Sequence, residues 1–245
     1  MELNLKDRVA LITGASSGFG AHFARLFVRE GARVIIGARR LDRIAALANE
    51  LGEAALPVAL DVTSEASIIA AYDAAEARFG TVDTVIANAG IANDGRSTEL
   101  PVDDIAAVVA TNFTGLYLTA REGAKRMIAA GFRETGRGRI VLIGSITAEM
   151  TGQGDSAYAA TKAGVIHLSR VVAVQHAPDG VRVNTVVPGQ LHTPMVEVRL
   201  AGQRTGGDVD ALLAECGGMM ALFETLAGVD GEVSPAFGLL PGQDR

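Results

Sequence analysis

Hydrophobic and polar residues follow two different patterns along the first third of the chain. Short apolar runs rich in β-branched residues, without polar alternation, predict buried strands at residues 9–13, 34–36, 56–60 and 82–87. Between them, apolar residues recur at helical spacing and predict helices after Gly18 and over residues 41–51 and 66–79. Apolar strands separated by helices are typical of a parallel sheet covered on both faces. The chain is therefore predicted to be α/β.

The second half continues in the same manner. A long helical pattern runs from Pro101 to about residue 130, and a polar segment, 131–139, leads into a predicted strand at 140–144. A helix at 157–176 and a sixth strand at 181–187 follow, and Pro188 and Gly189 end that strand. No linker divides the chain. These elements predict one domain, residues 1–245, built on a Rossmann-like, doubly wound parallel sheet.

Composition narrows the class of partner. The 245 residues are 49% hydrophobic and carry a net charge of −6, with no basic cluster beyond Arg39 and Arg40. This argues against nucleic acid or an anionic membrane as the main partner. The first residues lack the basic start and apolar core of a signal peptide, and no apolar stretch reaches membrane-spanning length. The single Cys216 fits a reducing cytoplasm, and the spacing of the histidines suggests no metal site.

A glycine-rich turn joins the first predicted strand to the first helix. It contains Gly14, Ser16, Ser17, Gly18, Phe19 and Gly20. Glycines permit a tight turn and let the backbone approach a pyrophosphate, which then rests on the positive end of the helix. The spacing G-x-x-x-G-x-G differs from the general dinucleotide fingerprint, and glycine turns after strands also arise for purely steric reasons.

Tyr158 and Lys162 stand one turn apart on the same face of their predicted helix. An ammonium group near a phenol favours the phenolate, which lowers the pKa of the tyrosine and makes it a usable general acid/base. Ser145 follows the apolar run 140–144, so its hydroxyl is predicted to lie at the end of a strand. A tyrosine and a lysine at this spacing also occur by chance in many helices.

Taken together, these motifs resemble those of the short-chain dehydrogenase/reductases of the common type, over residues 5–195. The resemblance implies a strand order of 3-2-1-4-5-6-7 and an active site at the carboxyl ends of the strands. It further implies an oxidoreductase that moves a hydride between a nicotinamide cofactor and a secondary alcohol or ketone. The matching features are the glycine turn, Asp61-Val62, Asn88-Ala89-Gly90, Asn112, Ser145, Tyr158, Lys162 and Pro188-Gly189 through Thr193.

The resemblance implies a catalytic tetrad. Tyr158 would give a proton to the carbonyl oxygen or take it from the alcohol, and Ser145 would orient that oxygen. Lys162 would hold the ribose of the nicotinamide and lower the pKa of Tyr158. Asn112 would hold a water that links Lys162 to solvent. Judged without the resemblance, Asn112 is an ordinary polar helix residue.

The same resemblance implies the remaining cofactor contacts. Asp61 would contact the adenine and Val62 would place its backbone beside the ring; without the resemblance, Asp61 is a turn or helix-start residue. The turn at Asn88 and Gly90 would pass beneath the cofactor, although Ala87 stands where the family commonly has another asparagine. The nicotinamide end would meet Pro188, Gly189, Leu191 and Thr193.

The end of the second predicted strand bears on the choice of cofactor. An acid there would repel a 2′-phosphate, but the chain has Ala38, followed by Arg39 and Arg40. A guanidinium suits a phosphate dianion, so Arg39 predicts NADP. NAD stays the alternative, because Ser17 stands where many NADP-using relatives carry Lys or Arg. A solvated helix cap is the structural alternative for the two arginines.

The last part of the chain is harder to interpret. Residues 190–228 are predicted to form the substrate loop and lid, while 229–245 show no convincing seventh strand. The resemblance implies a homodimer or homotetramer, paired through the Tyr158 helix and the long helix before it. Three functions remain open: an NADP- or NAD-dependent oxidoreductase, a non-catalytic NAD(P)-binding regulator, and a lyase or epimerase on the same fold.

Overall fold

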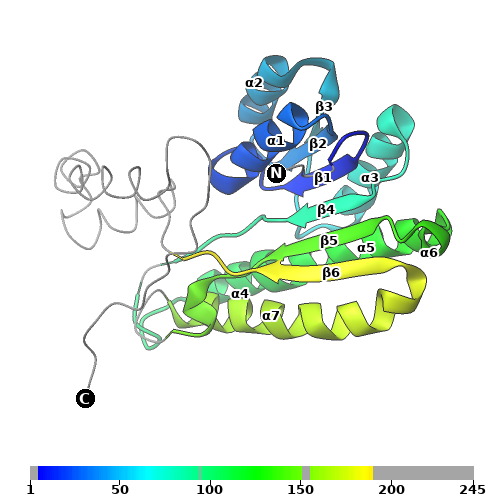
Figure 1. The fold of residues 1–245 in the computed structure, drawn as a ribbon. Helices are drawn as coiled ribbons and strands as arrows, with labels where there is room; N and C mark the ends of the chain where they lie inside the picture. Colours follow the sequence, from blue (N-terminus) through cyan, green and yellow to red (C-terminus); the bar gives the residue numbers. More distant parts are fainter. Residues whose placement is uncertain (1–4, 94, 151–154, 190–245) are drawn as a thin grey trace, which may run out of the picture. The chain divides into compact units, whose positions relative to one another are not determined.

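The computed structural model describes residues 5–93, 95–150 and 155–189, and these build one parallel sheet (Figure 1). The sheet has six strands in the order β3-β2-β1-β4-β5-β6. This confirms the predicted fold class and strand order as far as β6; the predicted seventh strand lies outside the described residues. The strands are β1 Val9–Thr13, β2 Arg33–Ala38, β3 Ala55–Ala59, β4 Thr84–Ala87, β5 Gly138–Ile143 and β6 Val181–Val186.

Helices connect the strands and cover both faces of the sheet (Figure 1). They are α1 Gly18–Arg29, α2 Leu41–Leu51, α3 Glu65–Phe79, α4 Val102–Val109, α5 Leu116–Ala129, α6 Phe132–Thr135 and α7 Ser156–His176. The long helix predicted from Pro101 is interrupted, because the residues between α4 and α5, Ala110–Gly115, form a π-helical turn. Such turns are rare and occur frequently at functional sites.

The polar segment before β5 also differs from the prediction. Part of it forms the short helix α6, and Gly138 and Arg139 already belong to β5. These two residues are recruited because they pair in register with Val181 and Arg182 of β6. The backbone amide of Arg139 also donates a hydrogen bond of 2.9 Å to the carbonyl of Asp83.

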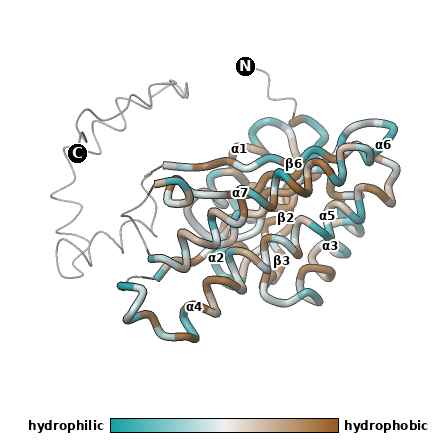
Figure 2. Tube along the Cα trace, turned by 90° about the horizontal axis from the view of Figure 1, so that it is seen from below, coloured by the Kyte–Doolittle hydropathy of each residue, from teal (hydrophilic) through white to brown (hydrophobic). Residues whose placement is uncertain are grey.

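Each face of the sheet carries its own hydrophobic core. Successive residues of a strand point to opposite faces, so Leu11 and Ile35 pack toward α3, α5 and α7, while Ile12 and Ile36 pack toward α1 and α2. All four of these side chains are fully buried. Hydrophobic colour accordingly follows the strands through the interior, whereas the helices alternate between hydrophobic and hydrophilic positions (Figure 2). The two cores hold the carboxyl ends of β1, β4, β5 and β6 at one edge.

Two predictions about organisation extend past the described residues. The single domain to residue 245, the lid at 190–228 and the tail at 229–245 stay predictions. Among the described helices, none combines the length and the apolar character needed to cross a bilayer.

Candidate active site

The glycine turn after β1 is packed too closely for side chains. Gly14 has a φ of +68°, and a Cβ there would lie 2.8 Å from the Cα of Ala89. A Cβ on Gly20 would overlap the carbonyl oxygen of Gly14 and lie 2.8 Å from the Cα of Ala15. Gly18, which opens α1, has a φ of +54°. Glycine is therefore required here by conformation and by close approach.

The start of α1 is suited to an anion. The N-cap residue, Ser17, makes no capping hydrogen bond with its side chain, and the first turn contains no acidic residue. The amide groups of a helix start carry a partial positive charge and need hydrogen-bond acceptors. A dinucleotide's pyrophosphate suits this place because the helix start supplies amide donors and no acidic side chain repels it.

Thr13 and Asn88 tie this turn to the end of β4. The Thr13 hydroxyl accepts hydrogen bonds from the backbone amides of Asn88 and Ala89, both at 3.0 Å. In return, the Asn88 side-chain amide donates to the carbonyl of Thr13 at 3.0 Å. The predicted Asn88 turn and the glycine turn therefore lie side by side. Thr13 was not among the predicted site residues.

Arg40, and not Arg39, contacts the glycine turn. Its Nη2 donates to the hydroxyl oxygens of Ser16 at 2.7 Å and of Ser17 at 3.0 Å. Arg39 is exposed and acts electrostatically on Asp61. Both arginines lie just beyond the buried end of β2, where Ala38 is 6% exposed. The sequence places both arginines beside the turn but does not reveal which one contacts it.

Asp61 closes a tight turn after β3. Its carboxylate accepts hydrogen bonds from the Thr63 hydroxyl at 2.7 Å and from the Thr63 backbone amide at 2.9 Å. These bonds, followed by the charge of Arg39, lower the pKa of Asp61. The next residue, Val62, is buried, and a Cβ on Gly115 would lie 2.7 Å from its carbonyl oxygen. The geometry matches the turn interpretation of Asp61; its contact with adenine stays a prediction.

Lys162 is buried at the centre of the site. Its side chain is held at the end of β5, where Nζ donates a hydrogen bond of 2.6 Å to the carbonyl oxygen of Ile143. Burial lowers the pKa of Lys162 from 10.5 to about 8. Nζ also lies 5.6 Å from the centroid of the Tyr158 ring. The predicted pair is thus brought together on α7, with the cation near the phenol.

Asp155 fixes the start of the helix that carries Tyr158. This buried residue is the N-cap of α7, and its Oδ1 accepts a hydrogen bond of 2.6 Å from the Tyr158 backbone amide. Its Oδ2 accepts another, of 3.0 Å, from the backbone amide of Asn93. Asp155 therefore joins the Tyr158 helix to the loop after β4. The prediction missed it, although an Asp just before a helical pattern is a usual N-cap signal.

Asn112 is buried in the π-helical turn, and both the oxygen and the nitrogen of its side-chain amide form hydrogen bonds. Oδ1 accepts a hydrogen bond from the Ile91 backbone amide and Nδ2 donates one to the Ile91 carbonyl, both at 2.8 Å. A Cβ on Gly90 would lie 3.4 Å from the Asn112 Oδ1 and 3.7 Å from the Lys162 Nζ. Asn112 thus anchors the loop that passes beside Lys162; its predicted water stays a prediction.

Ser145 lies two residues beyond the end of β5, close to the strand end where it was predicted. Its hydroxyl oxygen accepts hydrogen bonds from the Thr147 hydroxyl at 2.9 Å and from the Thr147 backbone amide at 3.3 Å. The short 3-10 turn that follows, Ile146–Ala148, packs against α7. The Ile146 amide donates to the carbonyl of Pro188 at 2.9 Å, which places the segment after β6 beside Ser145. Leu191 and Thr193 lie outside the described residues.

The structure therefore brings Ser145, Tyr158, Lys162 and Asn112 to the same edge of the sheet as the glycine turn. A model of the family described as short chain dehydrogenase matches residues 8–204. The chain belongs to the short-chain dehydrogenase family. This confirms the predicted family and the class of nicotinamide-dependent oxidoreductase.

Relatives with assigned names agree. The chain is similar to the cis-4-hydroxycyclohexanecarboxylate dehydrogenase of Sinomonas cyclohexanicum, with 42% identity over 78% of this chain and 76% of that one. It is 36% identical to the 3-oxoacyl-acyl-carrier-protein reductase of Vibrio harveyi over 82% of this chain and 81% of the other. A 3-ketoacyl-(acyl-carrier-protein) reductase from Brucella melitensis, solved in complex with NADH, superposes with a TM-score of 0.76. That match has 34% identity and covers 79% of this chain and 80% of the other.

Proposed function

We propose that this protein transfers a hydride between NADP(H) and a secondary alcohol or ketone, with Tyr158 as the general acid/base. The observation that carries the proposal is the buried Lys162 ammonium group near the Tyr158 ring. A cation near a phenol favours the phenolate over the phenol, and the phenolate is the form that accepts a proton. The names of the dehydrogenase and reductase relatives support the same reaction class.

A nicotinamide, when bound, supplies or accepts the hydride. In the reducing direction, the Tyr158 hydroxyl donates its proton to the substrate oxygen, and the Ser145 hydroxyl donates a hydrogen bond to the same oxygen. The phenolate left behind is stabilised by the Lys162 ammonium group. In the oxidising direction the phenolate takes the proton of the alcohol.

The proton of Lys162 is available near neutral pH. Because the pKa of Lys162 is about 8, the amine is charged at pH 7. This pKa lies close enough to pH 7 for the amine to exchange protons with a neighbouring donor or acceptor. One N–H of the ammonium group is held by its hydrogen bond to the Ile143 carbonyl oxygen. Asn112 holds the Ile91 backbone and thereby the loop on the other side of Lys162.

For the cofactor, we favour NADP over NAD. No carboxylate ends β2, where Ala38 is followed by two exposed arginines. Arg39 has its guanidinium available for a 2′-phosphate, and Arg40 already lies on the serines of the glycine turn. Against this, the charge of Arg39 acts on Asp61, and one relative was solved with NADH. NAD is the competing assignment.

The cofactor assignment is tested by the dissociation constants of NADPH and NADH, measured by fluorescence titration. One charge-assisted hydrogen bond is worth about 1.5–3 kcal/mol, so Arg39→Ala is expected to weaken NADPH about ten- to hundredfold and NADH little. Ala38→Asp combined with Arg39→Ala adds repulsion and is expected to invert the preference. Arg40→Ala is the matched comparison for the second arginine. Tighter NADH binding by the wild type, or equal weakening of both cofactors by Arg39→Ala, would refute the phosphate assignment.

The reaction class is tested by absorbance at the nicotinamide band, with NADPH and NADH against a panel of ketones and secondary alcohols. Turnover with any of them separates an oxidoreductase from a non-catalytic NAD(P)-binding regulator. Isomerised or cleaved product without net cofactor oxidation would favour an epimerase or lyase. A protein that binds the cofactor tightly but turns over nothing in the panel would favour the regulator.

We also propose that the chain acts as a homodimer or homotetramer in the cytoplasm. Exposed apolar residues on α5 and α7 support pairing: Tyr117 is 40% exposed, Val171 41% and Val174 77%. Also on α7, Gly164 lies close to the Phe113 ring of the same chain, where a Cβ would come within 3.0 Å of the ring. A monomeric mass at micromolar concentration, measured by light scattering, would contradict the proposal.

A further inference from the structure

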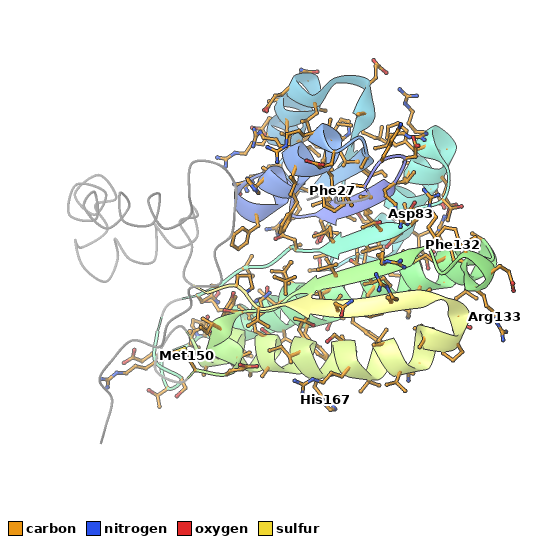
Figure 3. All side chains as sticks on the ribbon, viewed as in Figure 1. Phe27, Asp83, Phe132, Arg133, Met150 and His167 are labelled. Atoms are coloured by element: carbon orange, nitrogen blue, oxygen red, sulfur yellow. The ribbon has the colours of Figure 1, made fainter. Side chains whose placement is uncertain are left out.

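Basic side chains gather at the amino ends of the strands, the edge of the sheet opposite the candidate active site. Lys6 and Arg8 precede β1, and Arg139 lies near the start of β5. Figure 3 labels Asp83 and Phe132 near this end of the sheet and Met150 at the other end.

Arg182 brings a further positive charge to Arg139. The two residues are register partners on the parallel strands β5 and β6. Side chains of paired residues leave the same face of a sheet, so these guanidinium groups stand side by side. Two like charges this close repel each other, and an anion beside both would offset that repulsion.

A hollow of about 420 Å³ opens among these residues, and its lining contains no carboxylate. It is lined by Lys6, Arg8, Thr135, Gly136, Arg137 and Arg139. Its volume lies within the range of small-ligand sites, roughly 300–1,000 Å³. A macromolecule is not needed to fill it.

One buried carboxylate, Asp83, compensates only part of this charge. Its side chain is 2% exposed, and Arg137 donates to it from Nε at 2.8 Å. Arg8 lies 3.6 Å from its other oxygen, which also accepts the Thr84 hydroxyl at 2.7 Å. Both oxygens of Asp83 therefore have partners, and its ion pairs are with Arg8 and Arg137.

Lys6 and Arg139 keep their charge without such a partner. Within the described ranges, neither Lys6 nor Arg139 forms an ion pair with a carboxylate. The exposed carboxylate of Asp7 likewise forms no ion pair with a described cation. Arg139 uses Nη1 for the carbonyls of Gly136 and Gly138, which leaves Nε and Nη2 available. Burial, followed by the charges of Arg182 and Arg8, lowers the pKa of Arg139, and the charge of Asp83 acts in the opposite direction. The hollow thus concentrates positive charge in a chain whose net charge is −6.

We propose that this hollow binds a phosphate dianion, either free or as the phosphate group of a small molecule. Arg139 presents a planar fork of donors that matches two phosphate oxygens, and Lys6 adds a point charge. The Thr135 hydroxyl lies in the same lining. The negative charge of the whole chain disfavours a long polyanion such as nucleic acid. The site lies away from the glycine turn and does not depend on the proposed reaction.

The test is titration of the full-length protein with inorganic phosphate by calorimetry, in buffer kept at constant ionic strength with sodium chloride. Arg139→Gln removes the forked donor, and Lys6→Gln removes the second cation. Arg133→Gln is the matched control, because Arg133 is exposed on the neighbouring α6 and outside the hollow (Figure 3). Arg40→Gln controls for phosphate bound at the glycine turn.

Wild type, Arg133→Gln and Arg40→Gln are expected to bind phosphate with equal affinity, whereas Arg139→Gln binds about tenfold more weakly. Saturable binding also raises Tm with phosphate concentration, and this rise is expected to shrink in Arg139→Gln and Lys6→Gln. Without phosphate, Arg139→Gln relieves the repulsion from Arg182 and Arg8 but loses the hydrogen bonds to the Gly136 and Gly138 carbonyls, so a cooperative unfolding transition is expected and its Tm is measured beside that of wild type. That measurement also shows that the variant folds.

Three results would overturn the proposal. The first is no saturable phosphate binding by the wild type. The second is weakening by Arg40→Gln but not by Arg139→Gln or Lys6→Gln, which would assign the phosphate to the glycine turn. The third is equal weakening by Arg133→Gln and Arg139→Gln, which would indicate general charge screening. Glycerol phosphate in place of inorganic phosphate distinguishes the two sources: tighter binding assigns a phosphorylated small molecule, and weaker binding assigns free phosphate.

Discussion

Lys162→Met should change the pH dependence of folding stability in a direction that the structure dictates. The side chain is 3% exposed, and Nζ donates to the Ile143 carbonyl at 2.6 Å. Burial lowers its pKa from 10.5 to about 8 because the charged form loses its hydration. Methionine keeps most of the apolar stem and removes the titrating amine.

The magnitude follows from the two pKa values. At about 1.4 kcal/mol per pKa unit, lowering the pKa from 10.5 to about 8 means that folding disfavours charged Lys162 by roughly 3 kcal/mol. Below pH 8 the amine is charged in both states and the full cost is present. Between about 8 and 10.5 the unfolded chain binds more protons than the folded one, so wild-type stability rises with pH. Lys162→Met lacks this rise.

The assay is urea unfolding of both proteins at several pH values from 7 to 9.5. The stability of Lys162→Met relative to wild type is expected to fall by about 2 kcal/mol across this range, whatever its value at pH 7. Repeating the pair on a Tyr158→Phe background removes any contribution from titration of the phenol. If the difference in free energy of unfolding between the two proteins stays constant with pH, or if it grows in favour of Lys162→Met, the amine of Lys162 does not have a pKa lowered by burial.

Two further substitutions test the supports of the site. Asp155→Ala removes the cap of α7 and the acceptor of the Asn93 amide, so we expect a loss of about 2–4 kcal/mol and a lower kcat. Asp155→Ser should restore part of the stability and part of kcat, because serine can accept from the Tyr158 amide but not also from the Asn93 amide. Equal stability and equal kcat in wild type, Asp155→Ala and Asp155→Ser would contradict the positioning role. Asn112→Ala leaves the Ile91 amide and carbonyl unpaired and should cost about 1–3 kcal/mol for each group left buried. Cofactor affinity, measured by titration, should fall together with the stability. If both are unchanged in Asn112→Ala, the loop at Ile91 does not need this anchor.

The strands β1, β2 and β4 could be predicted from sequence because they are buried on both faces. Their apolar runs are continuous, and α2 was predicted with the bounds that it has, 41–51. The start of β5 was missed because Arg139 is polar and joins the sheet through its pairing with Thr84 of β4 and Arg182 of β6, which no local pattern shows. The π-helical turn at Ala110–Gly115 was missed because its hydrophobic pattern continues that of the flanking helices.

The candidate site was predictable where residue type and spacing identify it. Tyr158 and Lys162 share a helical face, and the structure brings the ammonium group beside the ring. The partners of Asn112 and Arg40 depend on side-chain direction in three dimensions, which no local pattern specifies. Asp155 differs from these, because an Asp directly before a helical pattern is a readable N-cap signal.

Tyr158→Phe tests most directly whether the phenol hydroxyl carries the proton of the reaction. The substitution removes one oxygen and leaves the backbone hydrogen bond from the Tyr158 amide to Asp155 in place. With a substrate found in the panel, kcat is expected to fall by about 10²–10⁴-fold, while the dissociation constant of NADPH stays nearly unchanged. If the variant keeps more than about a tenth of the wild-type kcat, the hydroxyl is not the general acid/base.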